Sequence, residues 1–235
     1  MMNKFIITSR QNPKFKLLKR LTTKKGRSKE GLFLAEGKKF LQLPSVDRFY
    51  LEGLEFDGTP LSKELFLEIS ALDNSEGVIS LFSFDYCNLD EMPDRVVILD
   101  GVQNPNNLGS IARNMKAFGF KGLILTKKCC DPFGPKSVRA SMGAVMDLKI
   151  CRIGDENLVE LSEKYRLFAA DSNSTSNNLE SLSIEGNIGL IFGNESNGIS
   201  EKFLAISDSI KIDTDIDSLN VAVASGILLY ILYNK

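Results

Sequence analysis

The sequence predicts an α/β protein with two domains, a small mixed one followed by a larger one built on a parallel sheet. The chain has 235 residues, enough for two modest domains. Residues 85–95 are polar, carry Pro93 and show no periodicity, which is typical of a linker. Six short apolar runs follow, separated by helical patterns, as expected for parallel strands buried on both faces. We therefore expect domains at 1–90 and 91–235.

The first domain begins with a basic helix at residues 12–21. Pro13 lies in its first turn, and the apolar residues Phe15, Leu17, Leu18 and Leu21 are spaced among lysines. Residues 22–31 read as a loop. The patterns beyond it predict alternating elements: strand 32–37, helix 38–43, strand 47–52, helix 62–72 and strand 77–84.

The second domain is predicted to alternate strands with helices. Its apolar runs place strands at 95–100, 121–126, 147–151, 166–171, 187–193 and 209–213. Asn106 or Asn107 is a candidate cap for a helix that Gly119 ends. The helix at 219–232 is so apolar that we expect it to be buried against the sheet or a partner subunit, with Ser218 as a candidate cap.

Several function classes are disfavoured by what the sequence lacks. There is no histidine, so Ser/His/Asp and Cys/His nucleophile systems are excluded. The four cysteines show no CxxC spacing, which argues against zinc, and neither a GxGxxG nor a GxxxxGK[ST] motif is present. No apolar run approaches the roughly 18 residues of a membrane span, and the start lacks a signal-peptide core, so we expect a cytoplasmic protein.

Charge is distributed unevenly along the chain. Residues 1–48 hold 13 Lys and Arg against 3 Asp and Glu, whereas the remainder holds 16 against 27. A basic arm on an acidic body favours a nucleic-acid partner, because neutralising phosphates dominates such binding. Solvated lysines alone would give the same pattern. The candidate RNA-binding residues are Arg10, Lys14, Lys16, Lys19, Arg20, Lys24, Lys25 and Arg27.

Three segments rich in Gly and Asn each adjoin an apolar strand or helix: 99–119, 189–200 and 217–230. Taken singly, each has an ordinary explanation: Arg113 as a solvated helix residue, Glu195 as a turn residue, Ser218 as a helix cap. Together they predict one polar ligand site at the strand ends of an α/β domain. The three segments lack the common nucleotide-binding motifs, but turns that present main-chain groups still suit an adenosine-containing ligand held by main-chain contacts.

In this order the three segments resemble the signature motifs of the SpoU-type (TrmH-like) RNA 2′-O-methyltransferases of the SPOUT class. The similarity covers 95–233 in detail, including "DPFGPKSVRASMGAV", and 9–90 more loosely. It implies a trefoil-knotted parallel-sheet domain, an exception to the rule against knots, preceded by a small L30e-like RNA-binding domain. It further implies bound S-adenosyl-L-methionine, a homodimer with active sites near the interface, and methylation of a ribose 2′-hydroxyl, with ribosomal RNA as the expected substrate.

The resemblance also assigns residues. The motif positions imply a catalytic set of Asn107, Arg113, Glu195, Ser218 and Asn220. They imply a cofactor-binding set of Gly193, Ile212 and Leu219, with Asn194 and Val221 beside them and Thr126 and Asp171 as further candidates. One departure is that Ile212 precedes the acidic "DTDID" where the family commonly has Ile-Pro-Met and a longer loop, which puts contacts at 213–217 in doubt.

For the mechanism, the sequence suggests that Arg113 is a holder of oxygens rather than a base, because guanidinium stays protonated. We expect Arg113, oriented by Glu195 and Asn107, to hold the 2′-oxygen and a phosphate, with Ser218 on the same phosphate and phosphate or water taking the proton. No metal is required. The alternatives are tRNA ribose methylation, methylation of a base nitrogen, and an inactive RNA-binding protein of the same fold.

Overall fold

The chain forms two compact units in the computed structural model, which describes residues 5–171 and 185–234. Unit 1 ends at Asp85 and also includes the later segment Phe133–Arg139; unit 2 holds Tyr86–Pro132 and the chain from Ala140 onward. The functional domains 1–90 and 91–235, the trefoil knot and the pairing of two chains stay predictions.

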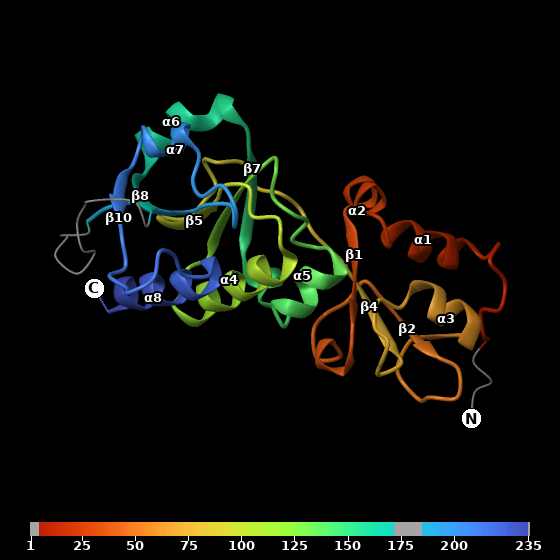
Figure 1. The fold of residues 1–235 in the computed structure, drawn as a ribbon. Coiled ribbons are helices and arrows are strands. Elements are labelled where there is room, and N and C mark those ends of the chain that lie inside the picture. The colour runs from red at the N-terminus through yellow and green to blue at the C-terminus, as the bar shows by residue number, and fades with distance from the viewer. Residues whose placement is uncertain (1–4, 172–184, 235) are drawn as a thin grey trace. The chain divides into compact units, whose positions relative to one another are not determined.

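Unit 1 is a four-stranded mixed sheet with helices (Figure 1). Its strands are β1 (Leu32–Glu36), β2 (Asp47–Leu51), β3 (Thr59–Leu61) and β4 (Val78–Ser83), in the order β1-β4-β2-β3. β4 is antiparallel to both of its neighbours, and β3 is parallel to β2. The helices are α1 (Pro13–Leu21), α2 (Lys24–Glu30) and α3 (Lys63–Ile69), with a 3₁₀ turn, η1 (Lys38–Phe40).

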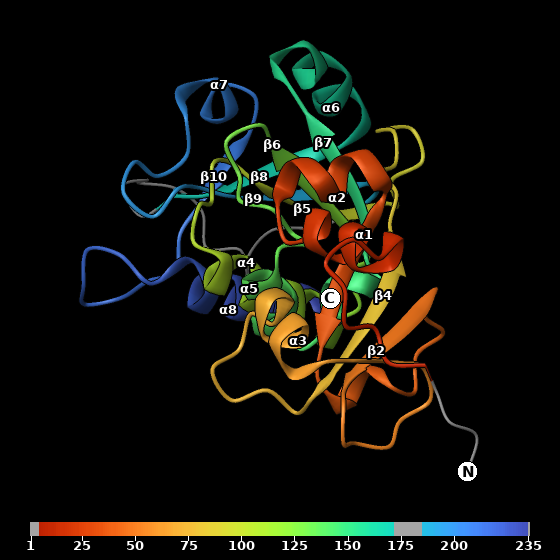
Figure 2. The same cartoon turned by 90° about the vertical axis from the view of Figure 1, so that its right-hand side faces the viewer.

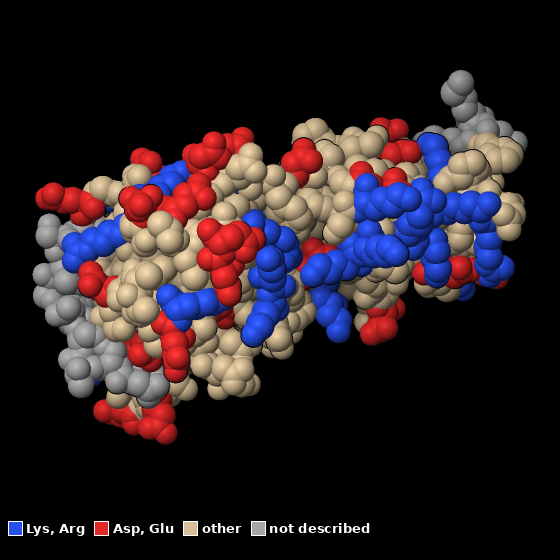
Figure 3. Space-filling model, turned by 90° about the horizontal axis from the view of Figure 1, so that it is seen from above, with Lys and Arg blue, Asp and Glu red and all other residues tan. Residues whose placement is uncertain are grey.

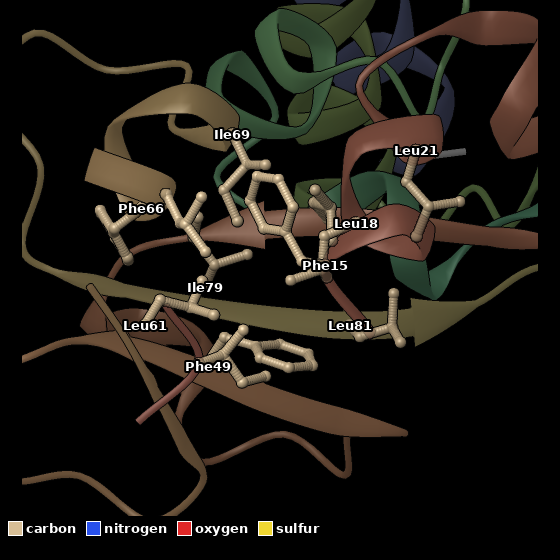
Figure 4. Close-up of a cluster of buried hydrophobic side chains, with 12 residues drawn as sticks. Phe15, Leu18, Leu21, Phe49, Leu61, Phe66, Ile69, Ile79 and Leu81 are labelled. Carbon is tan, nitrogen blue, oxygen red and sulfur yellow. The ribbon is translucent and has the colours of Figure 1, made fainter. Parts of the chain in front are cut away.

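The predicted helix at 12–21 is confirmed as α1, whose apolar face enters the core of unit 1 with β4 and α3 (Figure 4). The prediction of a loop at 22–31 is wrong. Thr23 Oγ1 accepts from Gly26 N at 3.1 Å at the start of α2, and Gly31, with φ of 63°, ends it. Such caps satisfy main-chain groups that a short polar helix cannot pair itself. The short strand β3 was not predicted.

Unit 2 contains a six-stranded parallel sheet in the order β10-β8-β9-β5-β6-β7. The strands are β5 (Arg95–Leu99), β6 (Gly122–Thr126), β7 (Lys149–Ile153), β8 (Arg166–Ala170), β9 (Ile188–Phe192) and β10 (Asp208–Ile210), which confirms all six predicted strands within a few residues. Leu99 pairs with Phe192 in the register of β5 and β9. The carboxyl ends of these two strands therefore open side by side.

Helices flank this sheet, and two of them matter for the site. α4 (Pro105–Ala117) and α8 (Val221–Tyr233) lie side by side (Figure 1, Figure 2). The predicted caps are wrong, because Asn104 rather than Asn106 or Asn107 caps α4 and Asn220 rather than Ser218 caps α8. Shorter helices complete unit 2: α6 (Leu158–Lys164) and α7 (Glu201–Leu204), with 3₁₀ turns η2 (Ala144–Asp147) and η3 (Asp155–Asn157). α5 (Pro135–Ala140) belongs to unit 1 except for its last residue.

The apolar helix α8 is only half covered within its own chain. Leu228, Leu229 and Leu232 are buried. Four other residues form an exposed stripe, with exposed fractions of 52% for Val223, 36% for Ile227, 56% for Tyr230 and 60% for Tyr233. Its own chain therefore buries one face of this helix, and burial of the other face against a partner subunit stays a prediction.

Candidate active site

A cavity of about 480 Å³ lies in unit 2, beyond the carboxyl ends of β8, β9 and β10 and before α8. In an open α/β sheet this is where ligands bind. Eight of the ten predicted catalytic and cofactor residues line the cavity: Gly193, Asn194, Glu195, Ile212, Ser218, Leu219, Asn220 and Val221. Asp171 also lines it, whereas Asn107 and Arg113 do not.

A chain of three side chains joins the three motif segments. Asn220 Oδ1 accepts from Ala222 N at 2.9 Å and caps α8, so the amide nitrogen of Asn220 is turned away from the helix. That nitrogen donates to Asn107 Oδ1 at 3.2 Å. Asn107 Nδ2 in turn donates to Glu195 Oε1 at 3.0 Å. Because the cap fixes the first amide, the direction of every later hydrogen bond follows.

The carboxylate of Glu195 is held by main-chain groups as well. It accepts from Gln103 N at 3.3 Å and from Asn104 N at 3.1 Å, and Asn194 Nδ2 donates to it at 3.3 Å. Burial raises the pKa of Glu195, but the hydrogen bonds from Asn107 and the main chain outweigh it and bring the pKa below its ordinary value. A carboxylate so stabilised is a weak base, which favours a positioning and electrostatic role.

The turn after β9 is packed too tightly for a side chain at its first residue. A Cβ on Gly193 would lie 2.2 Å from the carbonyl carbon of Gly198. Asn194 and Gly198 exchange two main-chain hydrogen bonds of 2.9 Å, and Asn194 Oδ1 accepts from the amides of residues 196 and 197. Asn194 Nδ2 also donates to Gly101 O at 2.7 Å. Asn194 therefore shapes the turn and ties it to β5.

Two residues at strand ends support the site without lining it. Thr126 Oγ1 accepts from Gly101 N at 3.0 Å, and the buried Asp100 accepts from Ser200 N at 2.9 Å. Thr126 is one of the predicted further candidates, whereas Asp100, the last residue of the strand predicted at 95–100, was not predicted as a site residue. Its signal in the sequence is a charged residue that directly follows four apolar ones, a position that needs a partner to be buried.

Arg113 does not meet the partners predicted for it. Its side chain is exposed and makes no hydrogen bond or ion pair with the residues that the structure describes. Arg113 lies six positions after Asn107 along α4, which places it about 120° around the helix from Asn107. The predicted orientation of Arg113 by Glu195 and Asn107 is therefore absent within one chain.

In the acidic segment 213–217, only Thr214 lines the cavity, and Asp213 forms an ion pair with Lys211 at 3.3 Å.

Lys and Arg side chains gather on a face of unit 1 over α1 and α2 (Figure 3). Many of the predicted RNA-binding residues already form ion pairs: Arg10 with Glu64 and Glu68, Lys14 with Asp47, Lys19 with Glu68 and Arg20 with Glu30. Lys16, Lys24 and Lys25 make none with the described residues. Arg27 is 5% exposed and donates to Leu21 O at 2.8 Å, so burial removes it from any RNA surface.

Comparison with known protein families matches residues 94–230 to the SpoU rRNA Methylase family. The chain belongs to this family. Residues 12–55 match an MRM3-like substrate binding domain. The SpoU match spans the cavity, all three motif segments and most of α8, so the predicted family is confirmed.

Relatives of this SpoU protein extend over nearly its whole length. It is 28% identical to the 23S rRNA (guanosine(2553)-2′-O)-methyltransferase RlmP of Bacillus subtilis, over 95% of this chain and 97% of the relative. It is also similar to the AdoMet-bound rRNA methyltransferase from Sinorhizobium meliloti, with 28% identity, a TM-score of 0.84, and coverage of 98% and 97%. The SpoU methyltransferase AviRb from Streptomyces viridochromogenes, 23% identical with a TM-score of 0.82, shares the fold.

These likenesses confirm the predicted fold class of a parallel-sheet SpoU domain after a small α/β domain. None of the described helices of this SpoU protein is long and apolar enough to cross a membrane. Within the described residues no group of three or more acidic or cysteine side chains is arranged to hold a metal ion.

Proposed function

We propose that this SpoU-family protein is an RNA methyltransferase that transfers the methyl group of S-adenosyl-L-methionine to a ribose 2′-hydroxyl. The observation that carries the proposal is the hydrogen-bonded chain from Asn220 through Asn107 to Glu195, which unites the three motif segments beside one cavity. RlmP of B. subtilis is named for ribose methylation of 23S rRNA, and the S. meliloti relative is an rRNA methyltransferase with AdoMet bound. Both support the same chemistry here.

The cavity fits S-adenosyl-L-methionine. Its volume of about 480 Å³ lies in the range of small-molecule sites, roughly 300 to 1,000 Å³. Gly193 leaves the main chain bare at its wall, and Ile212 and Leu219 line it from two further segments. Glu195, ionised near neutral pH, complements a cationic ligand. When bound, the cofactor supplies a methyl group already activated by its sulfonium.

The protein's own residues align the acceptor. Ser218 lies on the cavity wall, at the turn that leads into α8, and we assign its hydroxyl and the Arg113 guanidinium to a phosphate of the RNA. Arg113 holds the 2′-oxygen through its fork. Since Glu195 is engaged by several donors, the proton leaves to phosphate or water.

We propose that the active form is a homodimer. The stripe of Val223, Ile227, Tyr230 and Tyr233 is an exposed apolar face of the kind that a partner covers. Phe118, directly after α4, extends it, with its ring 5.8 Å from that of Tyr230. Because Arg113 does not reach the cavity of its own chain, we assign it to the cavity of the second copy.

The substrate that we propose is ribosomal RNA, methylated in the cytoplasm. Unit 1 presents unpaired lysines over α1 and α2 and matches an MRM3-like substrate binding domain. Phosphate neutralisation by such a face favours RNA over a small acceptor.

The direct test supplies labelled S-adenosyl-L-methionine and unmodified ribosomal RNA or tRNA, then digests the RNA to nucleosides. A 2′-O-methylated nucleoside from ribosomal RNA is expected. Label in tRNA or on a base would overturn the substrate or the acceptor assignment, and absence of transfer despite calorimetric cofactor binding would leave an inactive RNA-binding protein. Arg113→Lys is expected to lose turnover while keeping cofactor affinity, because an ammonium lacks the fork.

The dimer has its own test, mixing Arg113→Ala with Ser218→Ala. If Arg113 acts in the partner's site, each mixed dimer holds one site with both residues intact. Random pairing of equal amounts then restores about a quarter of normal activity. No recovery, although mass spectrometry shows mixed dimers, would place Arg113 in the site of its own chain.

A further inference from the structure

A second cavity, of about 180 Å³, lies inside unit 1. Its apolar walls come from the sheet and from α3: Leu34, Ile69 and Ile79 belong to the core cluster of unit 1 (Figure 4). The segment Phe133–Arg139 forms another wall, anchored by Phe133, whose ring lies 4.1 Å from that of Phe84. The cavity is smaller than the roughly 300 Å³ at which whole-cofactor sites begin, so it suits a single ring system.

Three charged side chains line this apolar cavity: Glu36, Glu68 and Arg139. Glu68 is engaged in ion pairs with Arg10 and Lys19, which leaves Glu36 and Arg139 for a ligand. Glu36 Oε1 accepts from Ser70 Oγ at 2.6 Å, and Oε2 accepts from Ala71 N at 2.9 Å. An ionised carboxylate has about four acceptor positions, so about two remain on Glu36. Arg139 also lines the cavity, is exposed, and makes no hydrogen bond or ion pair with any described residue. Apolar walls with one acceptor and a cation match a planar ring that carries an amino group and adjoins an anion.

The surroundings are basic. Thr22, a lining residue, lies between Arg20 at the end of α1 and Lys24 at the start of α2. Lys24 and Lys25 are exposed and free of ion pairs within the described chain. A strand of RNA whose phosphates follow the α1–α2 junction therefore passes this cavity.

We propose that this cavity receives one unstacked base from a single-stranded stretch of the RNA substrate. Glu36 accepts a hydrogen bond from the exocyclic amino group of that base, and Arg139 holds an adjoining phosphate. Sequence-specific recognition of RNA proceeds through such splayed bases. The inference rests on the proposed action on RNA, and it assigns part of the substrate choice to unit 1.

The test measures binding of the full chain to fluorescent oligo(C) and oligo(U) by anisotropy, since cytosine has an exocyclic amino group and uracil has none. Oligo(C) is expected to bind about tenfold more tightly. Glu36→Gln, which adds a competing donor, should reduce that ratio to about one. Glu76→Gln is the matched control: it removes the same charge in unit 1, and Glu76 also accepts from a main-chain amide, Lys38 N at 2.8 Å, but does not line the cavity.

Arg139→Gln should weaken both oligonucleotides equally and reduce the salt slope by about 0.7, as expected for one lost phosphate contact on a single strand. Lys63→Gln, at an exposed lysine of unit 1 away from the cavity, should leave the slope unchanged. Equal binding of oligo(C) and oligo(U) by the natural protein, or an unaltered ratio in Glu36→Gln, would overturn the base site alone. If neither oligonucleotide binds, both the base site and the RNA-binding role of unit 1 would be overturned. The methyl-transfer assay tests the active site separately.

Discussion

Replacing Asn107 by aspartate tests the hydrogen-bonded chain with almost no change in shape. Asn107 is 8% exposed, and its Nδ2 lies 3.0 Å from Glu195 Oε1. In Asn107→Asp that nitrogen becomes an oxygen, so two carboxylates face each other at the distance of a hydrogen bond. The other oxygen still accepts from Asn220. The substitution therefore isolates the contact with Glu195.

The penalty follows from two competing states of the variant. With both groups ionised, repulsion at 3.0 Å costs about 1.4 kcal/mol at the dielectric of water and about 5.5 kcal/mol at an effective value near 20. A lost hydrogen bond to a charged group adds about 1.5 kcal/mol or more. In the other state one carboxyl is protonated and the hydrogen bond is restored. Protonation costs about 1.4 kcal/mol for each unit by which the pH exceeds the ordinary pKa of the carboxyl, or about 4 kcal/mol at pH 7. The protein adopts whichever state costs less.

The variant is therefore expected to lose about 3 to 4 kcal/mol of unfolding free energy at pH 7 and only about 1.5 kcal/mol at pH 5. In the folded variant the two carboxyl groups share a proton with a pKa above the ordinary value, so the variant loses stability as the pH rises. In the natural protein the sign is opposite: the pKa of Glu195 is lowered, and its contribution is lost as pH falls through that pKa.

Urea unfolding at pH 5, 6 and 7 measures this difference. Asn106→Asp is the control, because Asn106 is an exposed neighbour on α4 whose side chain makes no hydrogen bond with the described residues. A carboxylate there, in the first turn of a helix, should change stability by less than about 1 kcal/mol at every pH. A penalty in Asn107→Asp that is the same at all three pH values would refute the close approach of residue 107 to Glu195.

Two further substitutions test the cavity wall and the linker. Gly193→Ala should weaken the affinity for S-adenosyl-L-methionine, measured by calorimetry, at least about tenfold, because the added Cβ would displace the following turn. Gly119→Ala is the control: Gly119 has a φ of 74° and no atom within 4 Å of the added Cβ. It should cost about 1 kcal/mol of stability and leave the affinity unchanged. Lys164→Met should lower the unfolding free energy by about 2 kcal/mol, because Nζ donates to the main-chain carbonyls of Leu89, Asp90 and Met92, in the predicted linker, at 2.7, 2.8 and 3.2 Å. Lys121→Met, at an exposed lysine, should change it by less than about 0.5 kcal/mol. Equal affinities in the two alanine variants, or equal unfolding free energies in the two methionine variants, would contradict these assignments.

The strands of unit 2 were predictable because burial on both faces leaves a continuous apolar run. Every residue of β6 and β9 is buried, and Thr126 at the end of β6 is the one polar residue in these two strands. α2 was not predictable in the same way. Its sequence, KKGRSKE, has no apolar periodicity, and it depends on the cap by Thr23 and on the buried Arg27. β3 has only three residues and contains Pro60, which the rules for strands disfavour.

The helix caps show where local rules stop. Residues 104, 106 and 107 are all asparagine, and each has the side chain that caps a helix. The choice among them depends on Glu195, about ninety residues away, which binds the amides of residues 103 and 104 and the side chain of Asn107. Only the folded sheet brings Glu195 to that helix end, so the sequence indicates the kind of residue but not its role.

The same argument gives the site its rigidity. Asn220 serves two purposes at once, since its oxygen begins α8 and its nitrogen is thereby aimed at Asn107. Moving the start of α8 to Ser218, as the sequence suggested, would free that oxygen and let the amide rotate, and Asn107 would no longer be compelled to present its nitrogen to Glu195. The position at which α8 begins therefore decides the orientation of the Glu195 carboxylate, two hydrogen bonds away. This explains why positions 220 and 107 both need asparagine, whose side chain has one donor and one acceptor end.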